Sequence, residues 1–135
     1  MTEAGDRAGD GRVRVVIADD VEDIRVLLTR AFETNGGLTV VGEAGDSAAA
    51  VSEAARTQPD IVVIDRSMPG PSPLTIVGQL REAAPSAAIV LLTATSEKRV
   101  EPDLVAAVDR CLEKATPLAE LVGTLLEVGR TGRRA

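Results

Sequence analysis

Polar side chains that can do chemistry follow four separate apolar runs of this chain. The positions are Asp19-Asp20, Asp65, Thr93 and Lys114. Each run is rich in β-branched or aliphatic residues, as strands are. Because a parallel sheet gathers the carboxyl ends of its strands along one edge, we expect three carboxylates, a hydroxyl and an ammonium to converge on one site.

Three carboxylates a few ångströms apart imply a cation, since like charges raise one another's pKa and disfavour full ionisation. Carboxylate oxygens completed by water are the ligands that Mg²⁺ prefers. The chain has no histidine and one cysteine, Cys111, so its composition does not favour zinc. Lys114 is one of only two lysines, against thirteen arginines, which makes an ammonium at a strand end informative.

The absent residue types narrow the chemistry further. Without histidine there is no Ser-His-Asp or Cys-His nucleophile and no histidine phosphoacceptor within the chain. With no Trp or Tyr and a single Phe, a site that stacks a flavin or a nucleobase is not expected. Phosphorus chemistry must therefore use a carboxylate. Asp65 would be the nucleophile, with Thr93 donating a hydrogen bond and Lys114 pairing with the phosphoryl group.

The elements that must position these groups alternate along the chain. Apolar runs predict strands over 13–20, 38–44, 60–65, 88–93 and 110–114. Between and after them, helical periodicity predicts five helices, over 24–32, 47–57, from 74 to before Pro85, from Pro102 onward and over 118–126.

Two of these helices are defined by an apolar stripe. Spacing i, i+3, i+4, i+7, i+8 marks the first, at Ile24, Leu27, Leu28, Ala31 and Phe32. In the last helix we expect Thr116 as the cap, Pro117 in the first turn, and a stripe at Leu118, Leu121, Val122, Leu125 and Leu126.

Strict alternation predicts an α/β fold, a doubly wound (βα)5 flavodoxin-like domain with a parallel five-stranded sheet of order 2-1-3-4-5. Its switch point lies between strands 1 and 3, where the three aspartates fall. We expect a disordered leader over 1–12, one domain over 13–129 and a basic tail over 130–135.

Composition excludes several classes of partner. A net charge of -6 argues against direct nucleic-acid binding by this domain. No apolar run approaches the roughly 20 residues of a membrane helix, and the polar N-terminus lacks the features of a secretory signal. We therefore expect a cytoplasmic protein without a membrane partner.

The same residues resemble the receiver domains of two-component response regulators, over about residues 13–128. The resemblance rests on IADD, VVIDRSMPG, LLTA and LEKATPLAEL. VVGEAGDSAAAV and QPDIVVID are most similar to receivers joined to helix-turn-helix output domains. The resemblance implies that Asp65 is the phosphoacceptor. It also implies that Asp20 and Asp65 bind Mg²⁺ directly with the Ser67 backbone carbonyl, while Asp19 supports the metal through water.

The resemblance also assigns a switch and partners. Thr93 is similar to the hydroxyl that closes on the phosphoryl group, and Lys114 to the lysine that pairs with it. The phosphoryl donor would be a phosphohistidine of a sensor histidine kinase or phosphotransfer protein. Phosphorylation and dephosphorylation would be self-catalysed, and the domain would not otherwise be an enzyme. Its output would be switched protein contacts, either a phosphorylation-dependent homodimer or docking of the monomer, and the sequence leaves both open.

The chain departs from the family pattern away from the chemistry. Cys111 replaces the usual aromatic residue of strand 5, Pro71-Ser72-Pro73 follows the phosphoacceptor loop, and Ala115 replaces a common proline. These departures favour an alternative, a receiver-fold interaction module that acts without phosphorylation. Two further possible functions are an aspartate-nucleophile hydrolase and a flavin protein. The chain lacks the Asp-x-Asp motif that is usual in such hydrolases, and it lacks the phosphate-binding loop of a flavin protein. Taken singly, the aspartates could also be helix caps or turn residues.

Overall fold

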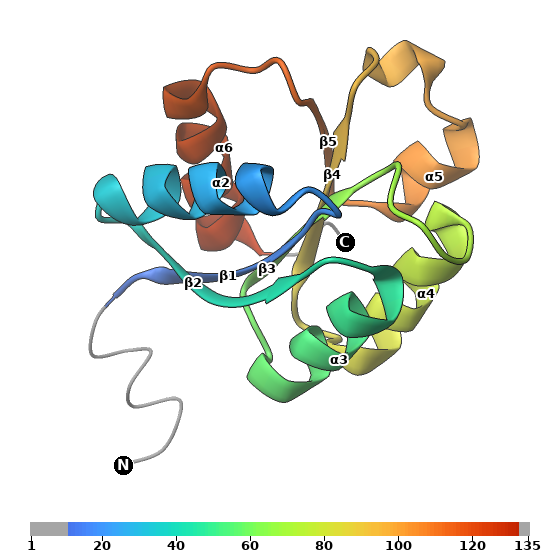
Figure 1. Cartoon of the computed structure of the whole chain (residues 1–135), viewed down its shortest axis with the longest axis horizontal. Helices are drawn as coiled ribbons and strands as arrows, with labels where there is room; N and C mark the ends of the chain where they lie inside the picture. Colours follow the sequence, from blue (N-terminus) through green and yellow to red (C-terminus); the bar gives the residue numbers. More distant parts are fainter. Residues whose placement is uncertain (1–10, 133–135) are drawn as a thin grey trace.

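A computed structural model describes residues 11–132 and shows one parallel sheet covered by helices on both faces (Figure 1). The strand order is β2-β1-β3-β4-β5, as the sequence predicts. The strands are β1 (Val13–Ala18), β2 (Leu38–Ala44), β3 (Ile61–Asp65), β4 (Ala88–Thr93) and β5 (Arg110–Glu113). The helices are α2 (Glu22–Thr34), α3 (Ser47–Thr57), α4 (Pro73–Ala83), α5 (Pro102–Ala107) and α6 (Leu118–Thr131), with a 3-10 turn, η1, at Glu97–Arg99.

Parallel pairing brings the carboxyl ends of β1, β3, β4 and β5 into line. Ala18 lies opposite Ile64, and Thr93 lies opposite Glu113. Backbone hydrogen bonds continue just past the strands, where Arg66 N donates to Leu92 O at 2.9 Å and Lys114 N donates to Thr93 O at 2.8 Å. The residues that follow the strands are therefore held in register at one edge.

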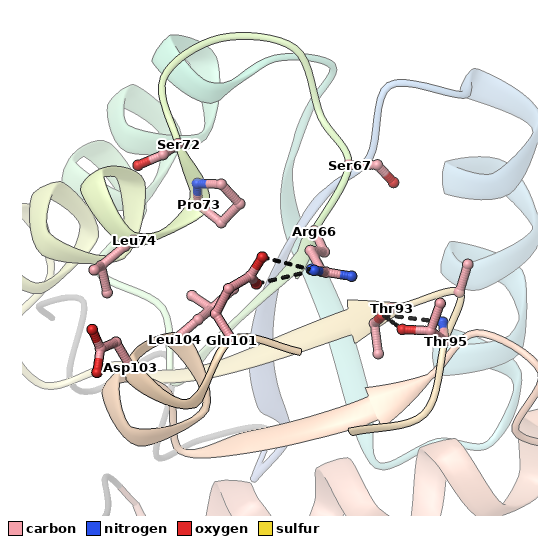
Figure 2. A pocket seen from close by; sticks show the side chains of 11 residues that line it. Arg66, Ser67, Ser72, Pro73, Leu74, Thr93, Thr95, Glu101, Asp103 and Leu104 are labelled. Carbon is pink, nitrogen blue, oxygen red and sulfur yellow. Dashed lines mark hydrogen bonds and ion pairs between the residues drawn. The ribbon is translucent and has the colours of Figure 1, made fainter. Parts of the chain in front are cut away.

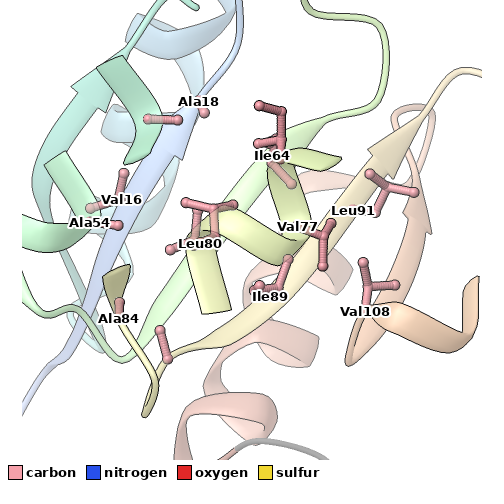
Figure 3. Packing of buried hydrophobic residues seen from close by; sticks show 14 of the residues in the cluster. Val16, Ala18, Ala54, Ile64, Val77, Leu80, Ala84, Ile89, Leu91 and Val108 are labelled. Atoms are coloured by element: carbon pink, nitrogen blue, oxygen red, sulfur yellow. The ribbon is translucent and has the colours of Figure 1, made fainter. Parts of the chain in front are cut away.

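The two faces of the sheet are buried in separate clusters because successive side chains of a strand point to opposite sides. One cluster packs the sheet against α3, α4 and α5 and includes Val16, Ile64 and Leu91, as Figure 3 shows. The other packs the sheet against α2 and α6, around Val63 and Leu125. Every residue of β3 is buried, which confirms it as the central strand covered on both faces.

Capping residues and prolines determine where the helices near the site begin. Asp46 caps α3, accepting a hydrogen bond from Ala49 N at 2.8 Å. Ser72 caps α4, accepting from Thr75 N at 3.3 Å, and Pro73 occupies the first helical position, where its missing N–H costs nothing. Pro102 begins α5 in the same way, as its sequence position predicts. These bounds confirm α3 over 47–57 and the expected start of α5.

The loop between Asp65 and α4 is tied to the neighbouring helix. The buried Ser47 hydroxyl at the start of α3 donates to Pro69 O at 3.2 Å. Gly70 follows with a φ of 121°, a conformation that favours glycine, and a Cβ there would lie 3.1 Å from Ser47 Oγ. This loop is therefore fitted closely against α3.

Three expectations about the helices are wrong in detail. Leu27 is 49% exposed, because α2 buries the line of Leu28 and Phe32 and Leu27 points about 100° away from it. Thr116 does not cap α6, whose N-cap residue is Pro117, without a side-chain cap hydrogen bond. Leu118 stands at the exposed start of that helix.

The structure describes only part of the proposed leader and of the proposed tail. Helix α6 extends to Thr131, so Arg130 and Thr131 are helical rather than part of a tail. Residues 1–10 of the proposed leader and residues 133–135 of the proposed tail lie outside the described residues. Among the helices of the described part, none is both long and apolar enough to cross a membrane.

Candidate functional site

Asp19, Asp20 and Asp65 come together at the edge where β1 and β3 end. One carboxylate oxygen from each lies within 4.8 Å of the others. Asp19 and Asp65 are buried, at 1% and 3% exposure, whereas Asp20 is open to solvent. The structure thus places two buried acids beneath an exposed one, a donor set of oxygens alone.

Lys114 reaches this cluster from the end of β5. Its Nζ lies 2.9 Å from Asp65 Oδ1 and 3.8 Å from Asp19 Oδ2. The first distance is that of a charge-assisted hydrogen bond, and the second is an ion pair beyond hydrogen-bond length. One ammonium therefore contacts both buried carboxylates, and the predicted convergence of strand ends includes it.

Asp65 also receives hydrogen bonds from the residue two positions on. Ser67 donates to Asp65 Oδ1 from its backbone N at 3.2 Å and from its hydroxyl at 3.3 Å. Ser67 is itself exposed at the mouth of the site. All these contacts, with that of Lys114, go to Oδ1, so this oxygen is the anchored one.

One carboxylate oxygen of Asp19 lacks a hydrogen bond among the described residues. Burial raises the pKa of Asp19 above its usual value, a backbone hydrogen bond from Val21 N opposes this, and the negative charge of Asp65 adds to it. Within the described residues the buried Asp19 Oδ2 has no hydrogen-bond partner, and Lys114 Nζ lies 3.8 Å from it. A buried carboxylate oxygen in this state is costly unless a cation or water contacts it. The residues present therefore fit a hard divalent cation with oxygen ligands.

Thr93 lies at the end of β4, 1% exposed, but its hydroxyl is directed to another residue. It accepts a hydrogen bond from Thr95 N at 3.1 Å and lies 3.2 Å from Thr95 Oγ1. Within the described residues its hydroxyl makes no hydrogen bond to the acidic cluster. Thr95, which the sequence analysis did not single out, is therefore the residue that orients it.

A cavity of about 520 Å³ adjoins the site, between the start of α4, the segment after β4, and α5 (Figure 2). Thr93, Thr95 and Ser67 line one part of it, and apolar side chains of α4 and α5 line another. An ion pair between Arg66 and Glu101 joins two of its walls. Sequence reasoning missed this pair, because residues 35 positions apart carry no local signal of contact.

The arrangement can bind a divalent cation and present a carboxylate to an electrophile. Asp65 offers the oxygen, Lys114 offers a positive charge beside it, and Asp19 and Asp20 offer cation ligands. Such a set of charges suits phosphoryl transfer, in which positioning and charge neutralisation carry most of the catalysis.

Comparison with known proteins identifies a family with this fold. Residues 15–126 match the family model described as the response regulator receiver domain. A protein-glutamate methylesterase/protein-glutamine glutaminase of Cereibacter sphaeroides is 39% identical over 92 residues, covering 67% of this chain and 25% of the relative. The chain spans about a quarter or less of the first curated relatives it matches.

Solved structures show the same fold. The REC domain of AraT, a response regulator from Geobacillus stearothermophilus, is 30% identical with a TM-score of 0.74, covering 88% of this chain and 96% of that one. A two-component response regulator of the LuxR family from Aurantimonas is 26% identical with a TM-score of 0.81, covering 91% and 89%.

Proposed function

The chain belongs to the family of response regulator receiver domains, and from that premise we propose that Asp65 accepts a phosphoryl group from a phosphohistidine of a sensor kinase or phosphotransfer protein. The observation that carries this proposal is the 2.9 Å ion pair between Lys114 and Asp65 inside the cluster of three carboxylates. This ion pair supports the proposal because an ammonium beside the attacking carboxylate would stabilise the charge that develops on the transferring phosphoryl group.

In the transfer step, a carboxylate oxygen of Asp65 attacks phosphorus while the bond between phosphorus and the donor nitrogen breaks. The electron pair of that bond stays on the nitrogen, and the new oxygen–phosphorus bond makes an aspartyl phosphate. Because Oδ1 is held by Lys114 and Ser67, we assign the attack to Oδ2. Lys114 then pairs with a phosphoryl oxygen, and the Thr93 hydroxyl, released from Thr95, donates to another.

Receiver domains bind Mg²⁺ at an acidic pocket, and here Asp19 Oδ2, which has no hydrogen-bond partner among the described residues, supports the same assignment. We propose that Asp20, Asp65 and the Ser67 backbone carbonyl hold Mg²⁺ directly, and that Asp19 supports it through water. When bound, the ion neutralises charge on the transferring phosphoryl group. Asp20 would hold the ion beside the buried Asp65 carboxylate, and Asp19 would orient a water ligand.

The output of phosphorylation is switched protein contact. The receiver fold is not catalytic by itself, so we propose self-catalysed phosphorylation and dephosphorylation rather than turnover of a substrate. A phosphorylation-dependent homodimer is one such contact, and direct binding of nucleic acid by this acidic domain is not expected. Sedimentation with and without beryllofluoride and Mg²⁺ tests dimer formation, and an unchanged mass would favour docking of the monomer.

Intact-mass measurement tests phosphorylation directly. Incubation with acetyl phosphate and Mg²⁺ should add one phosphoryl group, and Asp65→Asn should remove the addition. Asp23→Asn is the matched control, because it changes an exposed acid on the first turn of α2 outside the cluster. Absence of any addition to the wild-type chain, with acetyl phosphate and with a phosphorylated kinase domain, would contradict the proposal.

A second candidate function is a receiver-fold interaction module that acts without phosphorylation. It is favoured by Cys111, which is half-buried at the position where the family usually has an aromatic residue, and by the hydrogen bonding of Thr93 to Thr95. In that case Asp65→Ala should leave partner binding and self-association unchanged.

A further inference from the structure

Arg66 and Glu101 form an ion pair next to the phosphoacceptor, and its geometry leaves part of the guanidinium unused. Arg66 Nη2 donates to both oxygens of Glu101, each at 3.0 Å. The other guanidinium nitrogens, Nε and Nη1, have no hydrogen-bond partner within residues 11–132. The N–H groups of Nε and Nη1 are therefore available to bind a second anion.

The surroundings show where that anion could be. Arg66 directly follows Asp65, and its guanidinium lines the same cavity as Ser67, Thr93 and Thr95. In Figure 2 the guanidinium lies between the Glu101 carboxylate and the two threonines. Among the described residues that line the cavity, Arg66 is the only one with a positive charge.

The two partners differ in how firmly they are placed. The Arg66 side chain is 26% exposed, and its backbone is anchored to β4 through Leu92 O. The Glu101 side chain is 65% exposed, so water competes with the pair and weakens it. A phosphoryl group on Asp65 would bring a charge of about -1.5 to -2 close to Arg66, more than the single charge of Glu101.

Glu101 connects this pair to the start of a helix. It is the N-cap residue of α5, and its carbonyl accepts hydrogen bonds from Leu104 N at 3.0 Å and Val105 N at 3.1 Å. Helix α5 has only six residues. Its first turn is therefore tethered to the residue after Asp65 by one exposed ion pair.

The charge of Arg66 also affects the pKa of Cys111 in strand β5. Burial raises the pKa of the Cys111 thiol, the charge of Glu97 raises it further, and the charge of Arg66 opposes both. Cys111 stands at the position where the resemblance to receiver domains places an aromatic residue. The single aromatic residue of this chain, Phe32, is fully buried elsewhere and cannot take that role.

We propose that Arg66 is a phosphoryl-binding side chain that Glu101 holds away from Asp65 in the unphosphorylated state. Phosphorylation draws the guanidinium from the Glu101 carboxylate to the phosphoryl oxygens, and the first turn of α5 is released. Arg66 then couples the site to α5 in place of an aromatic residue. This inference rests on the proposed phosphorylation of Asp65.

Calorimetric titration with beryllofluoride in the presence of Mg²⁺ tests whether Glu101 and the phosphoryl group compete for Arg66. Glu101→Gln frees Arg66 and should tighten beryllofluoride binding by about two- to five-fold, the range expected for loss of one exposed ion pair. Arg66→Gln should weaken binding by a similar factor, and Arg66→Lys should recover part of the loss. Glu53→Gln is the control, since it removes a remote exposed ion pair with Arg56 and should change nothing.

Hydrogen exchange gives the second measurement. Beryllofluoride should increase amide exchange at Leu104 and Val105 in the wild-type chain, and Arg66→Gln should show that increase already without the ligand. Equal affinities for wild type, Glu101→Gln and Arg66→Gln would overturn the inference, as would tighter binding in both variants.

The result for the wild-type chain separates this inference from the function on which it depends. If the wild-type chain binds beryllofluoride and Asp65→Asn abolishes this binding, the phosphoacceptor function is supported, whatever the result for the Arg66 variants. No binding of beryllofluoride by the wild type overturns both.

Discussion

Lys114 and Asp65 form a 2.9 Å ion pair that joins the ends of β5 and β3, the two strands on either side of β4. The Lys114 side chain is 34% exposed, while the Asp65 side chain is 2% exposed. A partly solvated ammonium thus faces two buried carboxylates, and its charge balances at most one of them. The cluster keeps a negative charge for a cation to neutralise.

Magnesium should stabilise the fold through this cluster. A ligand at about 100 times its dissociation constant adds about 2.7 kcal/mol to the free energy of unfolding. Thermal unfolding should therefore show a higher Tm with Mg²⁺, and Asp20→Asn should remove most of the increase. Asp23→Asn, at another exposed acid, outside the cluster, should keep the increase. Equal Mg²⁺ effects in the two variants would contradict a site at Asp20.

Replacing the lysine should destabilise the metal-free protein. Lys114→Met leaves Asp19 and Asp65 without their cation, and we expect the free energy of unfolding to fall by about 1–2 kcal/mol, a value reduced by the exposure of the lysine. Mg²⁺ should recover part of the loss. Chemical denaturation with and without Mg²⁺ measures both effects. Lys98→Met, at the other lysine, which is exposed, is the control.

The contribution of Asp19 to the pH dependence of stability should have the opposite sign to that of an acid whose pKa is lowered on folding. Because burial raises the pKa of Asp19 in the folded state, its contribution to stability is fully present below its unfolded pKa of about 3.9. That contribution is lost as the pH rises through the higher folded-state pKa. Without Mg²⁺, Asp19→Asn should therefore raise the free energy of unfolding at neutral pH and give no gain at acid pH. Denaturation curves across this range would contradict the assignment if the neutral-pH gain were absent.

A third buried acid, Asp109, lies outside the acidic cluster and has a structural role. Asp109 pairs with Arg81 at 3.0 Å and accepts a hydrogen bond from Ile89 N at 2.8 Å, which joins the end of α4 to the segment before β5. Asp109→Ala should cost about 3–5 kcal/mol, as breaking a buried pair does. Glu127→Ala, on an exposed face of α6, should cost less than about 0.5 kcal/mol. Urea denaturation compares the two.

Strand ends were predictable because they depend on local patterns. The apolar runs before Asp65 and Thr93 give the bounds of β3 and β4, and strict alternation gives the sheet order. Once that order is known, the gathering of Asp19, Asp65 and Lys114 follows from geometry. The fold and the membership of the acidic cluster could therefore be read from the sequence.

Contacts set by tertiary packing could not be predicted. The exposure of Leu27 depends on how α2 rotates against the sheet, and a stripe of apolar residues does not determine that rotation. The hydrogen bonds of Thr93 to Thr95, and of Arg66 to Glu101, depend on side-chain rotamers and on where α5 docks. These are the contacts that bear on how a signal leaves the site.

The hydrogen bond from Ser47 to Pro69 has a consequence for the encounter with a phosphoryl donor. It fixes the loop after Asp65 during folding, when the loss of conformational entropy is offset by the burial of the whole core. If the proposed phosphotransfer occurs, a donor protein would meet a surface that needs little further ordering, so more of its contact energy would remain as affinity. The start of α3, which supplies no atom to the proposed chemistry, would thereby contribute to how tightly a donor binds.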